Sequence, residues 1–211
     1  MELVDYLYQI YGYDNPIFLK DVKIGRKSKS AIREEFYRAV KSGKLERESN
    51  GIYFLRSNKE FGSGVSFPQI IESKFIYGPF DEEPLRSMFI EGYYSGLSFV
   101  NKIGISTQVP AILEITTNKT KSNKRMIAIG GFRAIIRKGR TEINAENFKL
   151  LQFLDMFRFV TEREVKANRK LLSKYIKNNN FTKSSLKKYI KYYSAKTINK
   201  ITEGKLIDAF A

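Results

Sequence analysis

The chain has 211 residues, 42% of them hydrophobic, which is enough for one large domain or two small ones, and we expect two. It contains no cysteine and no histidine, so disulfides, thiolate metal sites and the commonest general base are excluded, and we expect no catalytic residues, metal or cofactor. The net charge of +16 predicts an anionic partner, nucleic acid rather than a membrane surface. No apolar run is long enough to span a bilayer, which predicts a soluble, cytoplasmic protein without a membrane partner.

The N-terminal segment begins with two predicted helices. Apolar residues recur at helical spacing between Leu3 and Gly12, which predicts the first helix. After a turn, Pro16 is expected to start a short second helix that covers Ile17 to Val22.

The run from Ser28 to Ser42 is a predicted amphipathic helix, and the rest of the segment is organised around it. Its apolar residues would line one face of the helix, and these are Ala31, Ile32, Phe36, Ala39 and Val40. Gly43 ends it, and short strands at 44–48 and 52–56 are expected to pair through Asn50-Gly51, which supplies the positive φ angles of a tight hairpin. This order of helices and hairpin predicts a winged helix-turn-helix DNA-binding domain over residues 1–56.

The candidate DNA-binding residues lie at the start of this helix and on the hairpin, and these are Lys27, Ser28, Lys29, Ser30, Arg33, Lys44 and Arg47. Backbone N–H groups and hydroxyls at a helix start can hold phosphates, while Arg33 or Lys29 reaches base edges. Ser28 also suits the helix N-cap, and a solvated hairpin explains the two hairpin cations equally well. Residues 20–47 carry a net charge of +6, which favours DNA contact on this side.

The rest of the chain predicts a linker at 57–65 and a mixed α/β domain at 66–211. Helices are expected at 67–75, 82–103 (one or two), 147–159, 162–177, 184–193 and 195–211, an extended segment at 76–80, and strands at 111–116, 124–129 and 132–137. The predicted fold class is therefore α+β.

The C-terminal helices hold most of the positive charge. Residues 161–211 carry +9 of the total of +16. Several of the lysines there are expected to share a helix face; the candidates are Lys187, Lys188 and Lys191, with Lys183 and Lys196 nearby. They form either a nucleic-acid or antitoxin surface or a solvated helix over a core. Tyr192 and Tyr193 could stack on bases, although tyrosines at helical spacing more often belong to a core.

The string from Gly92 to Thr117, GYYSGLSFVNKIGISTQVPAILEITT, resembles the centre of the AbiEi-like antitoxins of type IV toxin–antitoxin systems. That family has an N-terminal winged helix and a helix ending in a Leu-Gly-Leu-Ser-Thr-Gln-Val-Pro-like turn, which is Ile103 to Pro110 here. The resemblance covers most of the chain, but the lysine-rich part after Thr161 departs from it. It implies a repressor that binds inverted repeats in its own promoter and an antitoxin that opposes a nucleotidyltransferase-like toxin, without the need for a stable complex.

Two other functions fit the sequence. The C-terminal helices could bind structured RNA. Alternatively, the protein is a winged-helix regulator that responds to a small ligand, which predicts an apolar pocket in the second domain.

Overall fold

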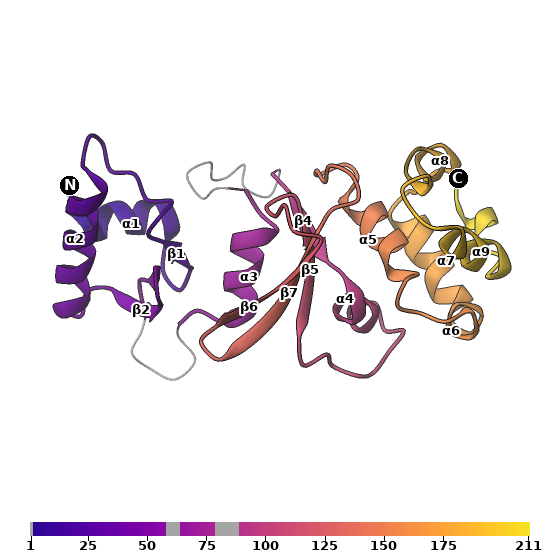
Figure 1. Ribbon diagram of the computed structural model, residues 1–211, viewed down its shortest axis with the longest axis horizontal. Helices are drawn as coiled ribbons and strands as arrows, with labels where there is room; N and C mark the ends of the chain where they lie inside the picture. Colours follow the sequence, from indigo (N-terminus) through magenta and orange to yellow (C-terminus); the bar gives the residue numbers. More distant parts are fainter. Residues whose placement is uncertain (1, 58–63, 79–88) are drawn as a thin grey trace. The chain divides into compact units, whose positions relative to one another are not determined.

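The computed structural model describes residues 2–57, 64–78 and 89–211, and it shows a mixed α+β protein, as predicted (Figure 1). The chain divides into two compact units, which we call the N-terminal unit (residues 1–89 and 128–132) and the C-terminal unit (residues 90–127 and 133–211). Residues 58–63 of the predicted linker and residues 79–88, where an extended segment and a helix start were predicted, lie outside the described residues. The predicted domain boundaries at residues 56 and 66 stay a prediction.

The N-terminal unit combines helices with a small antiparallel sheet. Its elements are α1 (Leu3–Tyr11), β1 (Ile17–Phe18), α2 (Lys29–Lys41), β2 (Glu46–Ser49), β3 (Ile52–Phe54) and α3 (Phe67–Phe75). The sheet has the order β1-β3-β2. Leu7, Ile32 and Phe36 join α1 and α2 in one hydrophobic core. The predicted helices α1, α2 and α3 are therefore present.

The short helix predicted from Ile17 to Val22 is wrong. Ile17 and Phe18 form β1, which pairs antiparallel with β3, and residues 19–21 form a turn. Consecutive side chains of a strand point to opposite faces. Ile17 packs into the core of α1 and α2, whereas Phe18 packs with Ile52 and with Ile70 of α3. A strand buries both apolar side chains because both faces of the sheet are covered.

The predicted hairpin follows α2 directly. Gly43 has a φ of 69° and ends the helix, as expected. At the hairpin turn only Gly51 takes a positive φ, at 74°, so the prediction that both Asn50 and Gly51 would do so is wrong. The pairing of β2 with β3 shifts between Arg47 and Ser49.

Asp14 holds the chain on both sides of residues 58–63. Its carboxylate accepts hydrogen bonds from the Ser57 hydroxyl and from the backbone N–H of Gly64, the latter at 3.0 Å. Ser57 and Gly64 are therefore attached to the same side chain of the N-terminal unit.

The C-terminal unit contains a second sheet and most of the helices. Its elements are β4 (Gly92–Tyr94), α4 (Gly96–Lys102), β5 (Leu113–Thr117), β6 (Lys124–Ile129), β7 (Phe132–Lys138), α5 (Phe148–Met156), α6 (Glu162–Ala167), α7 (Arg169–Asn178), α8 (Lys183–Ile190), α9 (Ala195–Glu203) and the 3₁₀ helix η3 (Ile207–Ala209), although the tip of the β6–β7 hairpin is assigned to the N-terminal unit. The sheet order is β4-β5-β7-β6, with β5 parallel to β7. The three predicted strands are present.

Several predicted helices have different limits in the structure. The prediction of helix across 82–103 is wrong at Gly92–Tyr94, which form strand β4. Tyr93 pairs there with Thr116 of β5, and its side chain is buried. The predicted helix is present only as α4, which follows β4. The helix expected at 162–177 is divided at Asn168, whose side-chain amide donates to the Glu164 carbonyl oxygen at 2.9 Å.

The last two predicted helices are also shorter than expected. The helix predicted at 184–193 is α8, which begins at Lys183 because Thr182 and Ser185 form its capping box, and it ends at Ile190. The helix predicted at 195–211 ends at Glu203, and Lys205 then takes a φ of 52° before η3.

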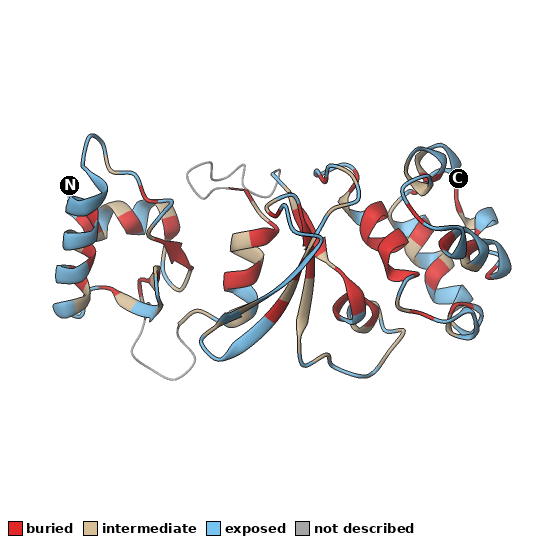
Figure 2. Ribbon diagram, in the orientation of Figure 1, coloured by how far each residue is buried: buried red, intermediate tan, exposed pale blue. Residues whose placement is uncertain are grey.

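The core of the C-terminal unit is built on α5. This helix is buried along nearly its whole length, and α6 to α9 gather beside it (Figures 1 and 2). The fully buried Phe153 ring lies 5.7 Å from the Tyr175 ring and 5.2 Å from the Phe157 ring, centroid to centroid. Lys200 of α9 donates hydrogen bonds to the carbonyl oxygens of Phe157 and Val160, at 2.8 and 2.6 Å, immediately after α5 ends.

A buried carboxylate in the same unit links the sheet to these helices. Asp155 Oδ1 lies 3.4 Å from Arg158 and 3.6 Å from Arg140, and the Asp155 side chain is 3% exposed. The Thr116 hydroxyl of β5 donates to the other carboxylate oxygen at 3.3 Å. Burial, and then the Asp155 charge, raises the pKa of Tyr193 well above its ordinary value.

Candidate nucleic-acid interface

The start of α2 is formed by a serine cap. The Ser28 hydroxyl accepts a hydrogen bond from the Ala31 backbone N–H at 3.2 Å, and its oxygen lies 3.0 Å from the Ser30 hydroxyl. The cap fixes where the helix begins, because it satisfies one of the N–H groups that have no partner inside the helix. Ser28 and Ser30 are both exposed, so their hydroxyls stand at the surface as the sequence predicted.

Lys29, Arg33 and Tyr37 follow one another at four-residue spacing along the exposed side of α2, and we call them the α2 ridge. Figure 2 shows this helix exposed along its outer side, while Ile32 and Phe36 are buried beneath it. Tyr37 is 63% exposed. Within the described part of the chain, neither Lys29 nor Arg33 has an ion-pair or hydrogen-bond partner for its side chain. Two cations of the ridge are therefore available to an anion.

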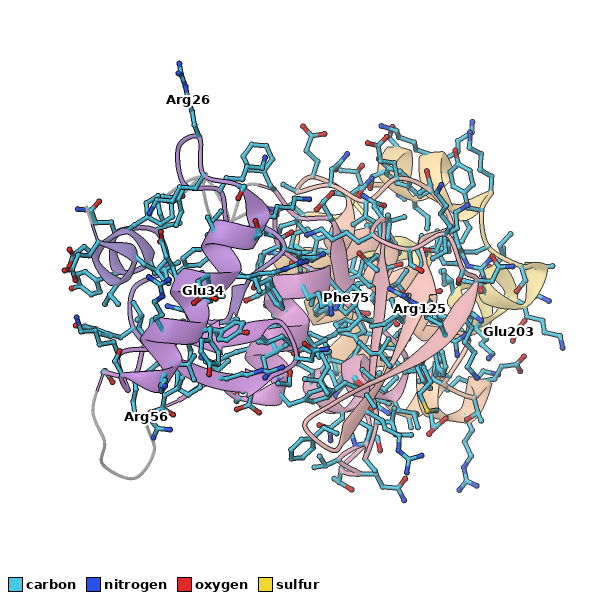
Figure 3. The ribbon with its side chains drawn as sticks, turned by 60° about the vertical axis from the view of Figure 1, so that its left-hand side comes forward. Arg26, Glu34, Arg56, Phe75, Arg125 and Glu203 are labelled. Carbon is cyan, nitrogen blue, oxygen red and sulfur yellow. The ribbon has the colours of Figure 1, made fainter. Side chains whose placement is uncertain are left out.

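The other charged side chains around α2 are partly engaged with each other. Lys27 Nζ lies 2.6 Å from the Glu35 carboxylate, and Arg38 Nε lies 3.2 Å from Glu34. Arg26 stands clear of the ribbon on the loop before α2 (Figure 3). Lys27 thus contributes less positive charge to a ligand than the sequence suggested, because a neighbouring carboxylate offsets it.

The two candidate residues of the hairpin have contacts within their own unit. Lys44 Nζ lies 3.6 Å from the Glu2 carboxylate, and both groups are exposed. Arg47 donates to the Asn50 side-chain oxygen at 3.2 Å, across the hairpin turn. These contacts fit a solvated hairpin, and an exposed ion pair of this kind is weak enough to be exchanged for a phosphate.

A cavity of about 460 Å³ adjoins the α2 ridge. Lys29 and Arg33 line it, together with Lys20 from the turn after β1 and Lys74 from α3. Lys20 and Lys74 were not among the predicted site residues. For Lys74 a signal was present, because it lies one helical turn after the buried Ile70.

The C-terminal lysines form a second exposed basic surface. Lys183, Lys187 and Lys191 recur at four-residue spacing along α8 and just beyond it, and all three are exposed. Lys188 and Lys196 are exposed as well. Three of these five lysines therefore share one side of the helix, as the sequence predicted for several of them.

The two tyrosines that follow α8 differ in their surroundings. Tyr193 is buried, and its hydroxyl donates to the Leu151 carbonyl oxygen at 3.0 Å, so this ring belongs to the core and is not available for stacking on a base. Tyr192 is 39% exposed, and Lys191 Nζ lies 5.2 Å from its ring centroid.

Other kinds of site find no support in the residues that the structure covers. Among them, no three Asp or Glu side chains cluster as metal ligands, and none of their helices is both long and apolar enough to cross a bilayer. The exposed cations of α2 and of α8 are therefore the basis for a functional proposal. The chain matches no protein-family model, and no curated protein matches it.

Proposed function

We propose that the protein is a DNA-binding transcriptional repressor whose N-terminal unit is a winged helix that places the start of α2 in the major groove. The observation that carries the proposal is the pair of exposed cations Lys29 and Arg33, one turn apart at the N-terminus of α2, neither of which has an ion-pair partner among the described residues. A helix N-terminus attracts phosphates, and an arginine one turn into the helix can reach guanine edges. In this proposal the β2–β3 hairpin, which follows α2, acts as the wing, although a turn at residues 19–21 stands where a winged helix-turn-helix would have its middle helix.

We further propose that this repressor is the antitoxin of a type IV toxin–antitoxin system, which autoregulates its operon and opposes a nucleotidyltransferase-like toxin. The proposal rests on the resemblance of residues 92–117 to AbiEi-like antitoxins. The Ser-Thr-Gln-Val-Pro string of that resemblance connects α4 to β5, and Val109 within it is 83% exposed.

Fluorescence anisotropy with a duplex from the promoter of the protein's own operon tests the DNA-binding proposal. Arg33→Ala should weaken binding by about 1–3 kcal/mol and relax specificity at one base position, because arginine pairs with guanine through two hydrogen bonds. Lys44→Ala should weaken binding to every sequence alike and reduce the slope against salt concentration by about one. Arg163→Ala, an exposed arginine of the C-terminal unit, is the matched control.

Equal affinities for the wild type, Arg33→Ala and Lys44→Ala would show that α2 and the hairpin do not contact DNA. The antitoxin proposal has a separate test, in which the gene next to that of this protein is expressed with and without it. Growth arrest by the neighbouring gene that this protein does not relieve would contradict an antitoxin role, whatever the DNA result.

A second candidate function is binding of structured RNA by the C-terminal unit, which the exposed row of Lys183, Lys187 and Lys191 favours. Deleting the helices is no test, because Leu172 and Ile176 of α7 belong to the same core as α5. The triple variant Lys183→Gln, Lys187→Gln and Lys191→Gln should instead lose tRNA binding and keep duplex binding if the two surfaces act separately. Loss of duplex binding alone would assign these lysines to the DNA contact.

A further inference from the structure

The turn directly before α2 displays one arginine at its apex. Residues 24–27 form this turn, which is closed by a hydrogen bond of 3.0 Å from the Lys27 backbone N–H to the Ile24 carbonyl oxygen. Gly25 and Arg26 are its two central residues, and Gly25 takes a φ of 49°. Arg26 is exposed, and its side chain points away from the rest of the unit (Figure 3).

The turn is anchored to both helices of the N-terminal unit's core. Ile24 packs against the core that α1 and α2 share. The Tyr6 hydroxyl of α1 donates to the Lys23 carbonyl oxygen at 2.6 Å. On the other side of the apex, Lys27 Nζ lies 2.6 Å from the Glu35 carboxylate of α2. The apex is therefore held in place before any ligand binds, which lowers the entropy that binding costs.

The guanidinium group at this apex has no partner in the described part of the chain. Neither an ion pair nor a hydrogen bond engages the Arg26 side chain there. The space beside it is open, because a Cβ added at Gly25 would lie more than 4 Å from every atom other than those of its chain neighbours. The turn is thus a slim projection that ends in one cation.

The hairpin that follows α2 presents its two cations differently. Arg47 donates to the Asn50 side-chain oxygen at 3.2 Å, and Lys44 Nζ lies 3.6 Å from the Glu2 carboxylate. The turn before α2 is therefore the projection beside this helix whose cation is not already engaged within the unit.

The position of Arg26 in the chain places it beside the DNA that α2 would contact. Arg26 precedes Lys29, the first residue of α2, by three residues, and three residues span at most about 11 Å. The major groove is about 12 Å wide, so a turn that leads into a helix start in that groove lies at the bordering sugar-phosphate backbone. Beyond this backbone is the minor groove, which is only about 6 Å wide and takes single arginine side chains.

Arginine suits a narrow minor groove better than lysine does. Its guanidinium is less strongly hydrated than an ammonium group, and the narrow minor groove of an A·T tract concentrates negative potential. A G·C pair places the guanine amino group in this groove. We propose that Arg26 is a specificity-determining residue that enters the minor groove of an A·T-rich segment next to the bases read by α2. This inference rests on the proposed DNA binding and names a second feature of the target.

Hydroxyl-radical footprinting of the full chain on the promoter duplex locates the contact, because these radicals attack the sugars from the minor groove. Protection of a short segment beside the α2 site should be present with the wild type and lost with Arg26→Ala. Three duplexes then carry A·T, inosine·C or G·C pairs in that segment. The wild type should bind the A·T and inosine·C duplexes alike and the G·C duplex about tenfold more weakly, because inosine lacks the guanine amino group.

Arg26→Ala should bind all three duplexes as weakly as the wild type binds the G·C duplex. Arg163→Ala, an exposed arginine of the C-terminal unit, is the matched control and should keep the preference for A·T. A loss in Arg26→Ala that is equal for the three duplexes would show a phosphate contact and overturn the proposal. Equal affinity of the wild type for the A·T and G·C duplexes, or protection that Arg26→Ala retains, would also overturn it.

The failure of this inference can be told apart from the failure of the proposed function. If Arg33→Ala and Lys44→Ala weaken duplex binding while Arg26→Ala does not, only the role of Arg26 is refuted. If none of the three variants changes duplex binding, the proposed function and the role of Arg26 are both refuted.

Discussion

Lys200 offers the most direct test of how the C-terminal unit is held together. Its ammonium donates to the carbonyl oxygens of Phe157 and Val160, which follow α5 and would otherwise lack partners inside that helix. Hydrogen bonds from a charged donor contribute about 1.5–3 kcal/mol each, and the two share one ammonium, so we expect Lys200→Met to cost about 2–4 kcal/mol. Methionine keeps most of the aliphatic stem and so removes mainly the charge and the donors.

Urea unfolding followed by far-UV circular dichroism measures this loss. Because the two units need not unfold in one step, hydrogen exchange of α5 and α9 should be followed in parallel and should become faster only in the C-terminal unit. Lys196→Met, one turn earlier on α9 and exposed, is the control and should stay within about 0.5 kcal/mol of the wild type. A Lys200→Met protein as stable as this control would refute the reasoning.

Three further predictions concern buried or capped groups of the same unit. Asp155→Asn should cost about 1–3 kcal/mol in urea unfolding, less than a fully buried pair, because its two arginine partners are about a third exposed. Hydrogen bonds from the Thr161 backbone and hydroxyl lower the pKa of Glu164. The ionised Glu164 carboxylate therefore adds to the free energy of unfolding above its ordinary pKa of 4.5, and this gain is lost as pH falls through the lowered pKa. The Glu164→Gln variant should show a flatter dependence of stability on pH between pH 5 and pH 3. The raised pKa of Tyr193 keeps its hydroxyl neutral in the folded state, so stability should fall as pH rises above 10, and Tyr193→Phe should lessen that fall in unfolding midpoints measured from pH 9 to 11.

The sequence predicted those elements whose local signals and tertiary packing agree. The α2 helix has an N-cap at Ser28, an apolar face and Gly43 at its end, and all three are present, but Ala31 is exposed, so its assignment to the apolar face was wrong. Ile17 and Phe18 were assigned to a helix because a proline precedes them, but their backbone pairs with β3. Tyr93 fits helical spacing with later apolar residues, yet it lies in a strand because Thr116 of β5 is available for pairing. Such pairing partners are distant in sequence and leave no local signal.

Some features of the candidate site could also be predicted from the sequence, and others depend on tertiary packing. The exposure of Lys29 and Arg33 follows from the amphipathic pattern of α2 and was predictable. The pairing of Lys27 with Glu35 depends on where the loop before α2 runs, which the pattern does not show. Lys74 lines the cavity beside the α2 ridge because α3 packs on the first sheet. Its spacing after Ile70 indicates on which side of α3 it lies, but not what that side faces.

The attachment of Ser57 and Gly64 to Asp14 has a practical consequence. Since one carboxylate anchors both sides of residues 58–63, changing the length of that stretch should leave Ser57 and Gly64 where they are. A fluorescent reporter inserted between Ser57 and Gly64 would therefore add an optical signal while α3, which begins at Phe67, keeps its place in the N-terminal unit.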